Sequence, residues 1–179
     1  MRATNATRQP LLAALLVVPG LLLASAPGLA GGDESEGDTS LPVFGYVEDI
    51  AVRALDGELR AKMDSGATTT SIDAREIEEF EKDDEEWVRF EVAHRDSDEM
   101  VTLERPVSRT VRIKRHDRSP QKRYVVELAL CLGDKWITDE VSLTNREQFS
   151  YGLLVGRNHM AGQLLIDPSA KDLQTSRCD

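Results

Sequence analysis

The residue in this sequence best suited to chemistry is Asp64, which is followed by Ser65, Gly66 and Ala67. Before it, residues 59–63 alternate between apolar and charged side chains, as in a half-buried strand. A carboxylate on a tight loop at a strand end can accept or donate a proton. The hydroxyl at the next position can anchor the loop, Gly66 lets backbone amides approach the carboxylate, and Ala67 leaves space for a substrate. Because the same four residues also fit an ordinary turn, the motif is informative only together with a second signal.

That second signal lies near the other end of the chain. An apolar run at residues 153–155 precedes Gly156, Arg157 and Asn158. This segment resembles the one that retropepsins pack beneath their catalytic loop, where apolar residues lead into Gly-Arg-Asn or Gly-Arg-Asp. The resemblance implies that these three residues support the loop that carries Asp64.

The resemblance extends over residues 43–173. This part of the chain is similar to a bacterial family of retropepsin-like aspartic peptidases, formerly labelled as ATP-dependent zinc proteases. The stretch Lys62–Ser71 resembles the family motif K-x-D-T-G-A-x-T-S. The other motifs that carry the resemblance are W-V-R-F at Trp87–Phe90, R-P-x-x-R at Arg105–Arg109, L-T-N-R at Leu143–Arg146 and L-I-D-P at Leu165–Pro168. The older label finds no support in the residues. There is no H-E-x-x-H motif, the three histidines are scattered, and no Gly-rich phosphate loop is present, so we expect neither a metal nor a cofactor.

The family resemblance implies an all-β fold: a single-lobed acid-protease barrel, closed on itself, with a short C-terminal helical turn. It also implies catalytic roles for Asp64, Ser65 and Gly66 and substrate contacts for Ala67 and Thr68. Three positions depart from the family pattern. Ser65 replaces the commoner Thr and keeps the hydroxyl. Thr68 replaces a frequent Arg, and Asp73 stands where a His is frequent. In viral retropepsins an acid at the Thr68 position pairs with the Arg of Gly-Arg-Asn, so the partner of Arg157 is left open here.

Aspartic hydrolysis of a peptide bond uses two carboxylates that share one proton. This chain has only one Asp-[Ser/Thr]-Gly motif. The second carboxylate is therefore expected from Asp64 of another copy, across a two-fold axis, which predicts a homodimer. The alternative is an inactive relative that keeps the scaffold as a binding or adaptor module.

Two segments could close over a substrate as a flap, residues 94–100 and residues 112–123. The second holds six basic residues and one acid, Asp117. We expect Arg115 and Arg118 to contact the substrate, and the resemblance makes an acidic or glutamate-rich peptide plausible. The alternative is a solvated hairpin tip.

Periodicity supports the all-β assignment independently of the resemblance. Apolar residues alternate with polar ones at 59–63, 88–92, 107–113, 124–132 and 137–143, which predicts strands in a fold of eight to ten. Turns are predicted at 56–57, 95–98, 105–106, 119–120 and 133–134. The acidic segment 76–86 reads as a solvated connection. Trp87, Trp136 and Phe149 are expected in the core and His159 at the surface.

The chain has 179 residues and a net charge of −10, which argues against a general nucleic-acid binder. Residues 1–30 read as a signal peptide, because a basic start leads into an apolar run at 11–24 that is too short to span a bilayer comfortably. An uncleaved anchor is the alternative. Residues 31–40 read as a flexible acidic linker and 41–175 as the peptidase domain, periplasmic and without a membrane span. Whether Cys131 and Cys178 pair is left open.

Overall fold

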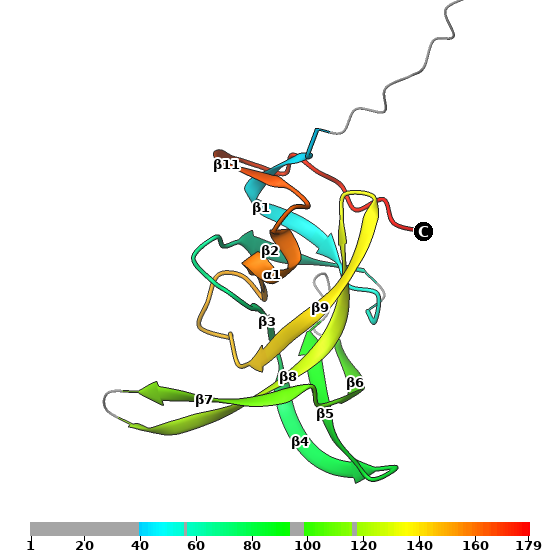
Figure 1. The fold of residues 1–179 in the computed structure, drawn as a ribbon, viewed down its shortest axis with the longest axis vertical. Helices are drawn as coiled ribbons and strands as arrows, with labels where there is room; N and C mark the ends of the chain where they lie inside the picture. The colour runs from blue at the N-terminus through cyan, green and yellow to red at the C-terminus, as the bar shows by residue number, and fades with distance from the viewer. Residues whose placement is uncertain (1–39, 56, 94–98, 116–117) are drawn as a thin grey trace, which may run out of the picture. The chain divides into compact units, whose positions relative to one another are not determined.

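The computed structural model describes residues 40–55, 57–93, 99–115 and 118–179, and it describes no side chain between residues 114 and 120. Within these residues the chain forms eleven strands and one short helix. They are β1 (Val43–Ala51), β2 (Glu58–Met63), β3 (Thr70–Asp73), β4 (Arg75–Lys82), β5 (Glu85–Ala93), β6 (Met100–Pro106), β7 (Arg109–Arg115), β8 (Arg118–Leu132), β9 (Lys135–Thr144), β10 (Leu153–Val155), α1 (Arg157–Met160) and β11 (Leu165–Lys171). The expected all-β fold is confirmed, and the expected helical turn is α1 (Figure 1).

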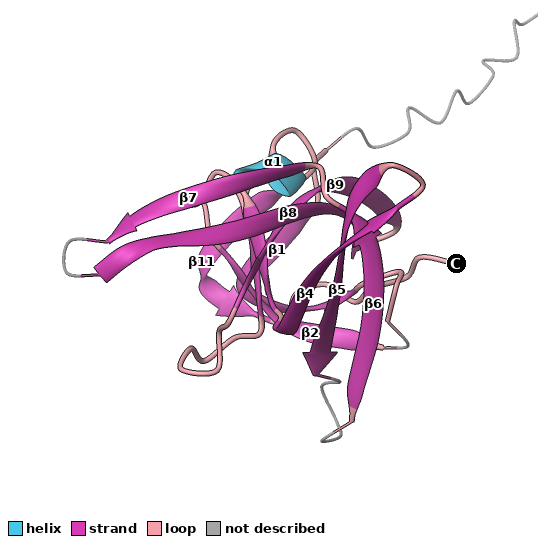
Figure 2. Cartoon of the chain, turned by 90° about the horizontal axis from the view of Figure 1, so that it is seen from below, coloured by secondary structure: helices cyan, strands magenta, loops and turns pink. Residues whose placement is uncertain are grey.

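The strands form two sheets. The larger has the order β11-β1-β2-β10-β3-β9-β8-β7, and the smaller has the order β4-β5-β6 (Figure 2). Pairing in the larger sheet ends at β11 on one side and β7 on the other, so the strand order does not confirm a closed barrel. An isolated bridge between Val52 and Leu130 links the end of β1 to β8. The buried apolar side chains of both sheets meet in one core.

The alternation in the sequence places the core side chains as expected. On β2, Leu59, Ala61 and Met63 are buried while the charged residues between them are not. On β8, the even-numbered residues Val126, Leu128, Leu130 and Leu132 are buried, and the odd-numbered Val125 and Cys131 are buried as well. Burial of such a face stabilises the fold in proportion to the apolar area that it removes from water. The apolar side chains that predict these strands from the sequence are therefore also the ones that pack the strands onto the core.

The acidic segment at 76–86 is not a connection, as we had expected, but most of the β4–β5 hairpin. Its register pairs Phe80 with Trp87, and the two rings lie 6.4 Å apart. Asp83 and Asp84 have φ values of 53° and 62°, the left-handed pair that a two-residue hairpin turn requires. Most side chains of β4 are exposed, so the strand has no clean apolar alternation to reveal it.

Within the described part of the chain, only one of the predicted turns is confirmed at the predicted residues. Residues 133–134 form a turn between β8 and β9. Residues 105–106 end β6, and 119–120 lie at the start of β8, where a register shift in the β7–β8 ladder accommodates the proline. The turn at 95–98 and residue 56 lie outside the described residues.

The C-terminal tail is tied to the sheet beyond residue 175, where we had expected the domain to end. The carboxylate of Glu48 is fully buried and accepts hydrogen bonds from the backbone N–H groups of Leu173 and Gln174. Further along, a disulfide joins Cys131 to Cys178, which answers the question that the sequence left open. The tail is therefore a fixed part of the fold.

Candidate functional site

The site is built where β10 separates β2 from β3, two strands that follow each other in the sequence. β10, from near the end of the chain, lies between β2 and β3, running parallel to β2 and antiparallel to β3. The loop at residues 64–69, which we call the catalytic loop, therefore joins two strands that do not pair with each other. The backbone N–H of Asp64 donates to the carbonyl of Val155 at 2.9 Å, which fixes the loop where it leaves β2.

The Asp64 carboxylate lies inside a tight turn. Its Oδ1 accepts a hydrogen bond from the Gly66 N–H at 2.9 Å, and its Oδ2 lies 3.9 Å from Lys62 Nζ. A Cβ at position 66 would lie 3.1 Å from that Oδ1, so a larger residue there would require the carboxylate to shift by a few tenths of an ångström. The φ of Gly66 is not in the left-handed region. The Asp64 side chain is 28% exposed, so the carboxylate is accessible to a ligand.

The Arg157 side chain bridges two residues of the catalytic loop. Its Nη1 donates to the Ser65 carbonyl at 2.8 Å, and its Nη2 donates to the Thr68 hydroxyl at 2.9 Å. The backbone N–H groups of Arg157 and Asn158 donate to the carbonyls of Ala67 and Thr68. The partners of Arg157 are therefore a backbone carbonyl and a hydroxyl, and not an acid as in viral retropepsins. Thr68, expected to contact the substrate, is engaged in holding the loop.

Thr70, at the start of β3, connects the loop to the helical turn. Its buried hydroxyl accepts a hydrogen bond from the Gly156 N–H at 2.9 Å and lies 2.9 Å from His159 Nδ1. Asn158 Oδ1 accepts from the Thr70 N–H at 3.0 Å, and its Nδ2 donates to the Glu140 carbonyl at 2.8 Å. Gly156 approaches so closely that a Cβ there would lie 2.6 Å from a backbone atom of the loop. Gly156, Arg157 and Asn158 therefore all contact the loop or the start of β3, as the sequence predicted.

His159 is fully buried, so our expectation of a surface residue is wrong. Its Nε2 lies 3.5 Å from the Leu128 carbonyl, and its Nδ1 lies 2.9 Å from the Thr70 hydroxyl, which also lies 3.1 Å from Asn158 Oδ1. Burial lowers the pKa of the His159 imidazole below its ordinary value, because the charged ring would lose its hydration. The ring is therefore a neutral structural support of the loop.

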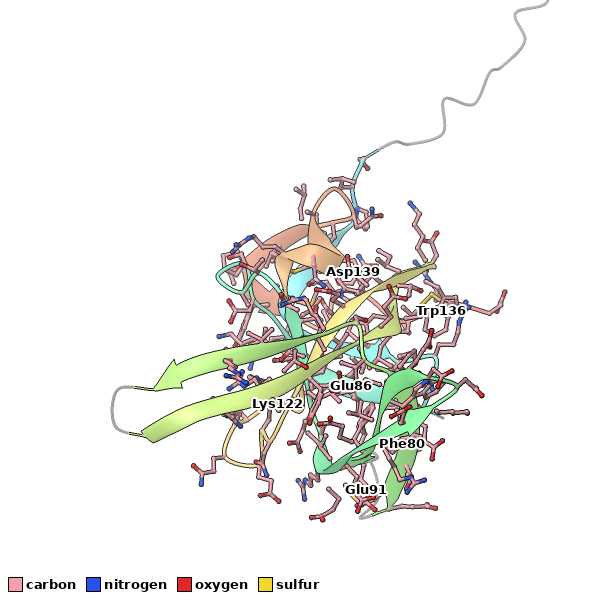
Figure 3. All side chains as sticks on the ribbon, turned by 60° about the horizontal axis from the view of Figure 1, so that its bottom comes forward. Phe80, Glu86, Glu91, Lys122, Trp136 and Asp139 are labelled. Carbon is pink, nitrogen blue, oxygen red and sulfur yellow. A yellow bond between two sulfur atoms is a disulfide. The ribbon has the colours of Figure 1, made fainter. Side chains whose placement is uncertain are left out.

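The β7–β8 hairpin extends as an arm from the body of the fold (Figures 1 and 2). Figure 3 labels Lys122 on the arm, near Glu86 of the smaller sheet. Lys122 pairs with Glu79 at 2.6 Å and with Glu86 at 3.6 Å, and the Tyr124 hydroxyl also donates to Glu79. These exposed contacts lower the pKa of the Glu79 carboxyl, chiefly through the Lys122 hydrogen bond. The smaller sheet thus supports the base of the arm.

This arm is the better placed of the two expected flaps. Val111 and Ile113 of β7 line a cavity of about 350 Å³ together with Ala67 and Thr69 of the catalytic loop. Ala67, expected at the substrate site, is therefore at the edge of a cavity. Arg115 and Arg118 pair in register at the far end of the hairpin, but their side chains lie outside the described residues. Residues 94–98, in the other expected flap, also lie outside.

A second cavity adjoins the loop on another side. It has a volume of about 460 Å³ and includes Ser65 and Arg157. Most of its remaining lining is apolar, from the segment that joins α1 to β11: Met160, Ala161, Gly162, Leu164, Leu165, Ile166 and Pro168. Leu165 is 54% exposed. The exposed side of the catalytic loop is thus continuous with an apolar surface.

The sequence indicated no role for Arg146, which lines the cavity between the catalytic loop and β7. Its Nη1 donates to the Ser71 hydroxyl and its Nε to the Tyr151 carbonyl, at 3.0 and 3.1 Å. The L-T-N-R motif marked the residue without indicating a function. Phe149, expected in the core, is 63% exposed and lies under the Arg146 guanidinium, whereas Trp87 and Trp136 are partly buried.

The described residues contain no group of three or more His, Cys, Asp or Glu side chains arranged to hold a metal ion. Among the same residues, no helix has the length and apolar character needed to cross a bilayer.

Comparisons with known proteins agree with this geometry. Residues 43–177 match the RimB-like family, described as the retropepsin-like aspartic endopeptidase RimB. A crystal structure of a Legionella pneumophila protein of unknown function is 34% identical, with a TM-score of 0.66 over 76% of this chain and 100% of that one. Two proteins named probable alpha-L-glutamate ligase, from Parasynechococcus marenigrum and Desulfotalea psychrophila, are 36% and 38% identical over 62% of this chain. The chain spans 24% of the length of each of these two relatives.

Proposed function

Because the chain belongs to the RimB-like family of retropepsin-like aspartic endopeptidases, we propose that it hydrolyses peptide bonds as a homodimer. Each copy supplies Asp64, and a water molecule is activated between the two carboxylates. The observation that carries the proposal is the position of Asp64. It lies at an accessible loop tip that the Gly66 N–H and Arg157 hold in place. A scaffold without catalysis has no need of an accessible carboxylate in a braced loop.

The chemistry follows from two like charges at close range. Two adjacent carboxylates cannot both ionise easily, so together they hold one proton. The ionised member takes a proton from water as the water attacks the peptide carbonyl, and the protonated member donates to the carbonyl oxygen. The tetrahedral intermediate then collapses, and a proton passes to the leaving nitrogen. Each step uses only the two Asp64 side chains and water.

The dimer is supported by the surroundings of the catalytic loop. Ser65 and Gly66 are exposed beside the apolar cavity that Met160 and Leu165 line. A two-fold contact through this face would bury the apolar surface and bring the two Asp64 loops together. Ser65 would then form hydrogen bonds across the axis.

The substrate is proposed to be an acidic, glutamate-rich peptide. Two observations support this substrate. Relatives named as glutamate ligases contain a segment similar to this chain, and the arm beside the catalytic loop is rich in basic residues. A peptide with several carboxylates would be attracted to such an arm over a distance of about 10 Å at moderate salt.

We further propose that residues 1–30 direct export and that the mature enzyme acts in the periplasm. The Cys131–Cys178 disulfide supports this location, because such bonds form and persist in oxidising compartments.

The deciding experiment compares the wild type with Asp64→Asn on a set of glutamate-rich peptides, with products identified by mass spectrometry. The amide can still accept from the Gly66 N–H, so the fold should persist while hydrolysis is lost. Asp134→Asn, in the exposed β8–β9 turn, is the matched control and should cleave as the wild type does. Activity of Asp64→Asn near that of the wild type would refute the assignment. Binding of the peptides without cleavage by the wild type would favour the adaptor function.

A mixing experiment tests the dimer separately. When the wild type and Asp64→Asn are mixed in equal amounts and allowed to exchange, about a quarter of the dimers hold two carboxylates. Activity per wild-type chain should therefore fall to about half. Unchanged activity per wild-type chain would show that one copy is sufficient, whereas sedimentation velocity should show a dimer at the assay concentration.

A further inference from the structure

The cavity between the catalytic loop and the arm has an unusual charge. Three arginines line it, Arg109, Arg123 and Arg146, and the residues found to line it in the described part of the chain include no Asp or Glu. The chain as a whole carries a net charge of −10. A concentration of positive charge in one cavity is therefore the opposite of what the composition would produce by chance.

Arg146 is half-buried, whereas Arg109 is exposed. The hydrogen bonds of the Arg146 guanidinium go to neutral groups, the Ser71 hydroxyl and the Tyr151 carbonyl, while its backbone N–H donates to the Asp73 carboxylate. Burial, together with the neighbouring charge of Arg123, lowers its pKa from the ordinary value, although Asp73 and Asp64 act against this. Two guanidinium groups that face one cavity repel each other, and an anion between them would remove that repulsion.

Arg109 differs from Arg146 in its partner. Its guanidinium donates to both carboxylate oxygens of Glu140 at 2.9 Å, so its charge is largely matched within the protein. The pKa of Arg109 is raised, chiefly by this hydrogen-bonded pair. The charge offered to a ligand therefore comes mainly from Arg146.

We propose that this cavity binds a side-chain carboxylate of the peptide substrate, with Arg146 as the residue that determines specificity. The inference rests on the proposed function. Ala67 and Thr69 belong both to the catalytic loop and to the cavity lining, so a side chain in the cavity contacts the loop that carries Asp64. A volume of about 350 Å³ is at the small end of ligand sites and suits a single side chain.

The preference for an acid over its amide follows from guanidinium chemistry. A guanidinium presents parallel N–H groups that a carboxylate accepts in pairs, and the charge strengthens each bond. Val111, Ile113 and Leu154 supply apolar walls for the methylene groups of the bound side chain. Glutamine has the same shape but brings N–H donors towards cationic donors. Replacing glutamate by glutamine in the cavity should therefore lower kcat/KM by about tenfold to a hundredfold.

The test compares peptide pairs that differ only in glutamate or glutamine at one position next to the scissile bond. The measured quantity is the ratio of kcat/KM for the two peptides, at about 0.15 M salt so that long-range steering is screened. The wild type should prefer glutamate. Arg146→Met should bring the ratio close to one, and Arg146→Lys, which keeps the charge but loses the paired donors, should be intermediate.

Arg112→Met is the matched control. Arg112 is exposed and lies between Val111 and Ile113 on β7, so its side chain points to the face opposite the cavity. Like Arg146→Met, this variant removes one positive charge near the cavity, but from the outer face of the arm, and it should keep the wild-type ratio. If Arg112→Met lowers the ratio as much as Arg146→Met does, diffuse charge on the arm explains the preference and the cavity does not.

Three further outcomes separate the possible failures. A wild type that cleaves both peptides of every pair equally well overturns the cavity proposal and leaves the peptidase intact. If Arg146→Met does not fold, judged by its thermal transition, Arg123→Met serves in its place and should also reduce the ratio. If the wild type cleaves nothing, the proposed function fails, and calorimetry on Asp64→Asn decides the cavity alone. Glutamate-peptide binding that Arg146→Met abolishes would then uphold it, and binding that is unaffected would overturn it.

Discussion

Replacing Thr70 with valine removes one hydroxyl group from the base of the catalytic loop and should destabilise the whole domain. The hydroxyl is fully buried, and the Gly156 N–H and His159 Nδ1 each lie 2.9 Å from it. Without it, both groups remain buried and lose their partner, at a cost of about 1–3 kcal/mol each. The extra methyl group returns about 0.8 kcal/mol. We therefore expect a loss of roughly 3 kcal/mol in the free energy of unfolding, or about 6–12 °C in melting temperature.

The assay is urea unfolding followed by circular dichroism, with the slope against denaturant required to stay constant. Thr70→Ser is the matched control, because it keeps the hydroxyl and loses only a methyl group, at a cost of about 1 kcal/mol. The serine variant should therefore be more stable than the valine variant, although it buries less apolar surface. If the valine variant is as stable as the wild type, or more stable than the serine variant, the hydroxyl is not the connection that we describe.

Three other perturbations test separate parts of the structure. Gly156→Ala should cost about 1–3 kcal/mol in denaturant titration, because its Cβ would lie 2.6 Å from backbone, whereas Gly152→Ala, with its nearest contact at 4.0 Å, should stay within about 1 kcal/mol of the wild type. The pKa of His159 is lowered below 6.5, so the unfolded chain binds the proton first and stability should fall as the pH drops below that value, by up to about 1.4 kcal/mol per pH unit. His159→Gln should show a shallower pH dependence, and an equal slope would contradict the assignment. Cys178→Ser opens a loop of sequence separation 47 to Cys131 and should cost about 4 kcal/mol in the chain-entropy model, and a cost below about 1 kcal/mol would show that the other tail contacts suffice.

The fold was predictable where apolar and polar residues alternate along a strand. The strands β2 and β5 alternate clearly, because one side of each packs on the core. The strand β4 was missed because its side chains are charged on both sides. Its position depends on pairing with β5, including Phe80 opposite Trp87, and pairing is not visible in one segment alone. The short strands β3 and β10 were missed as strands because three or four residues show no period.

The site was predictable where its residues form contiguous motifs. Asp64 and the Gly-Arg-Asn segment stand in short patterns of fixed order, and the structure brings them together. Arg146 and Arg123 belong to different strands and loops, and only the fold places them in one cavity. His159 follows the Gly-Arg-Asn segment and reads as polar, but the helical turn directs its ring into the core.

The hydrogen bond between Arg157 and Ser65 joins residues 92 positions apart, and this separation affects the order of events during synthesis. A ribosome releases Asp64 long before it releases Arg157, so the nascent chain carries its reactive carboxylate on a loop that nothing yet holds. Contacts between such distant residues also form late in folding, since the chain must first lose much of its conformational freedom. We therefore expect the loop that carries Asp64 to reach its final geometry only after Arg157 has been synthesised and β10 has inserted between β2 and β3.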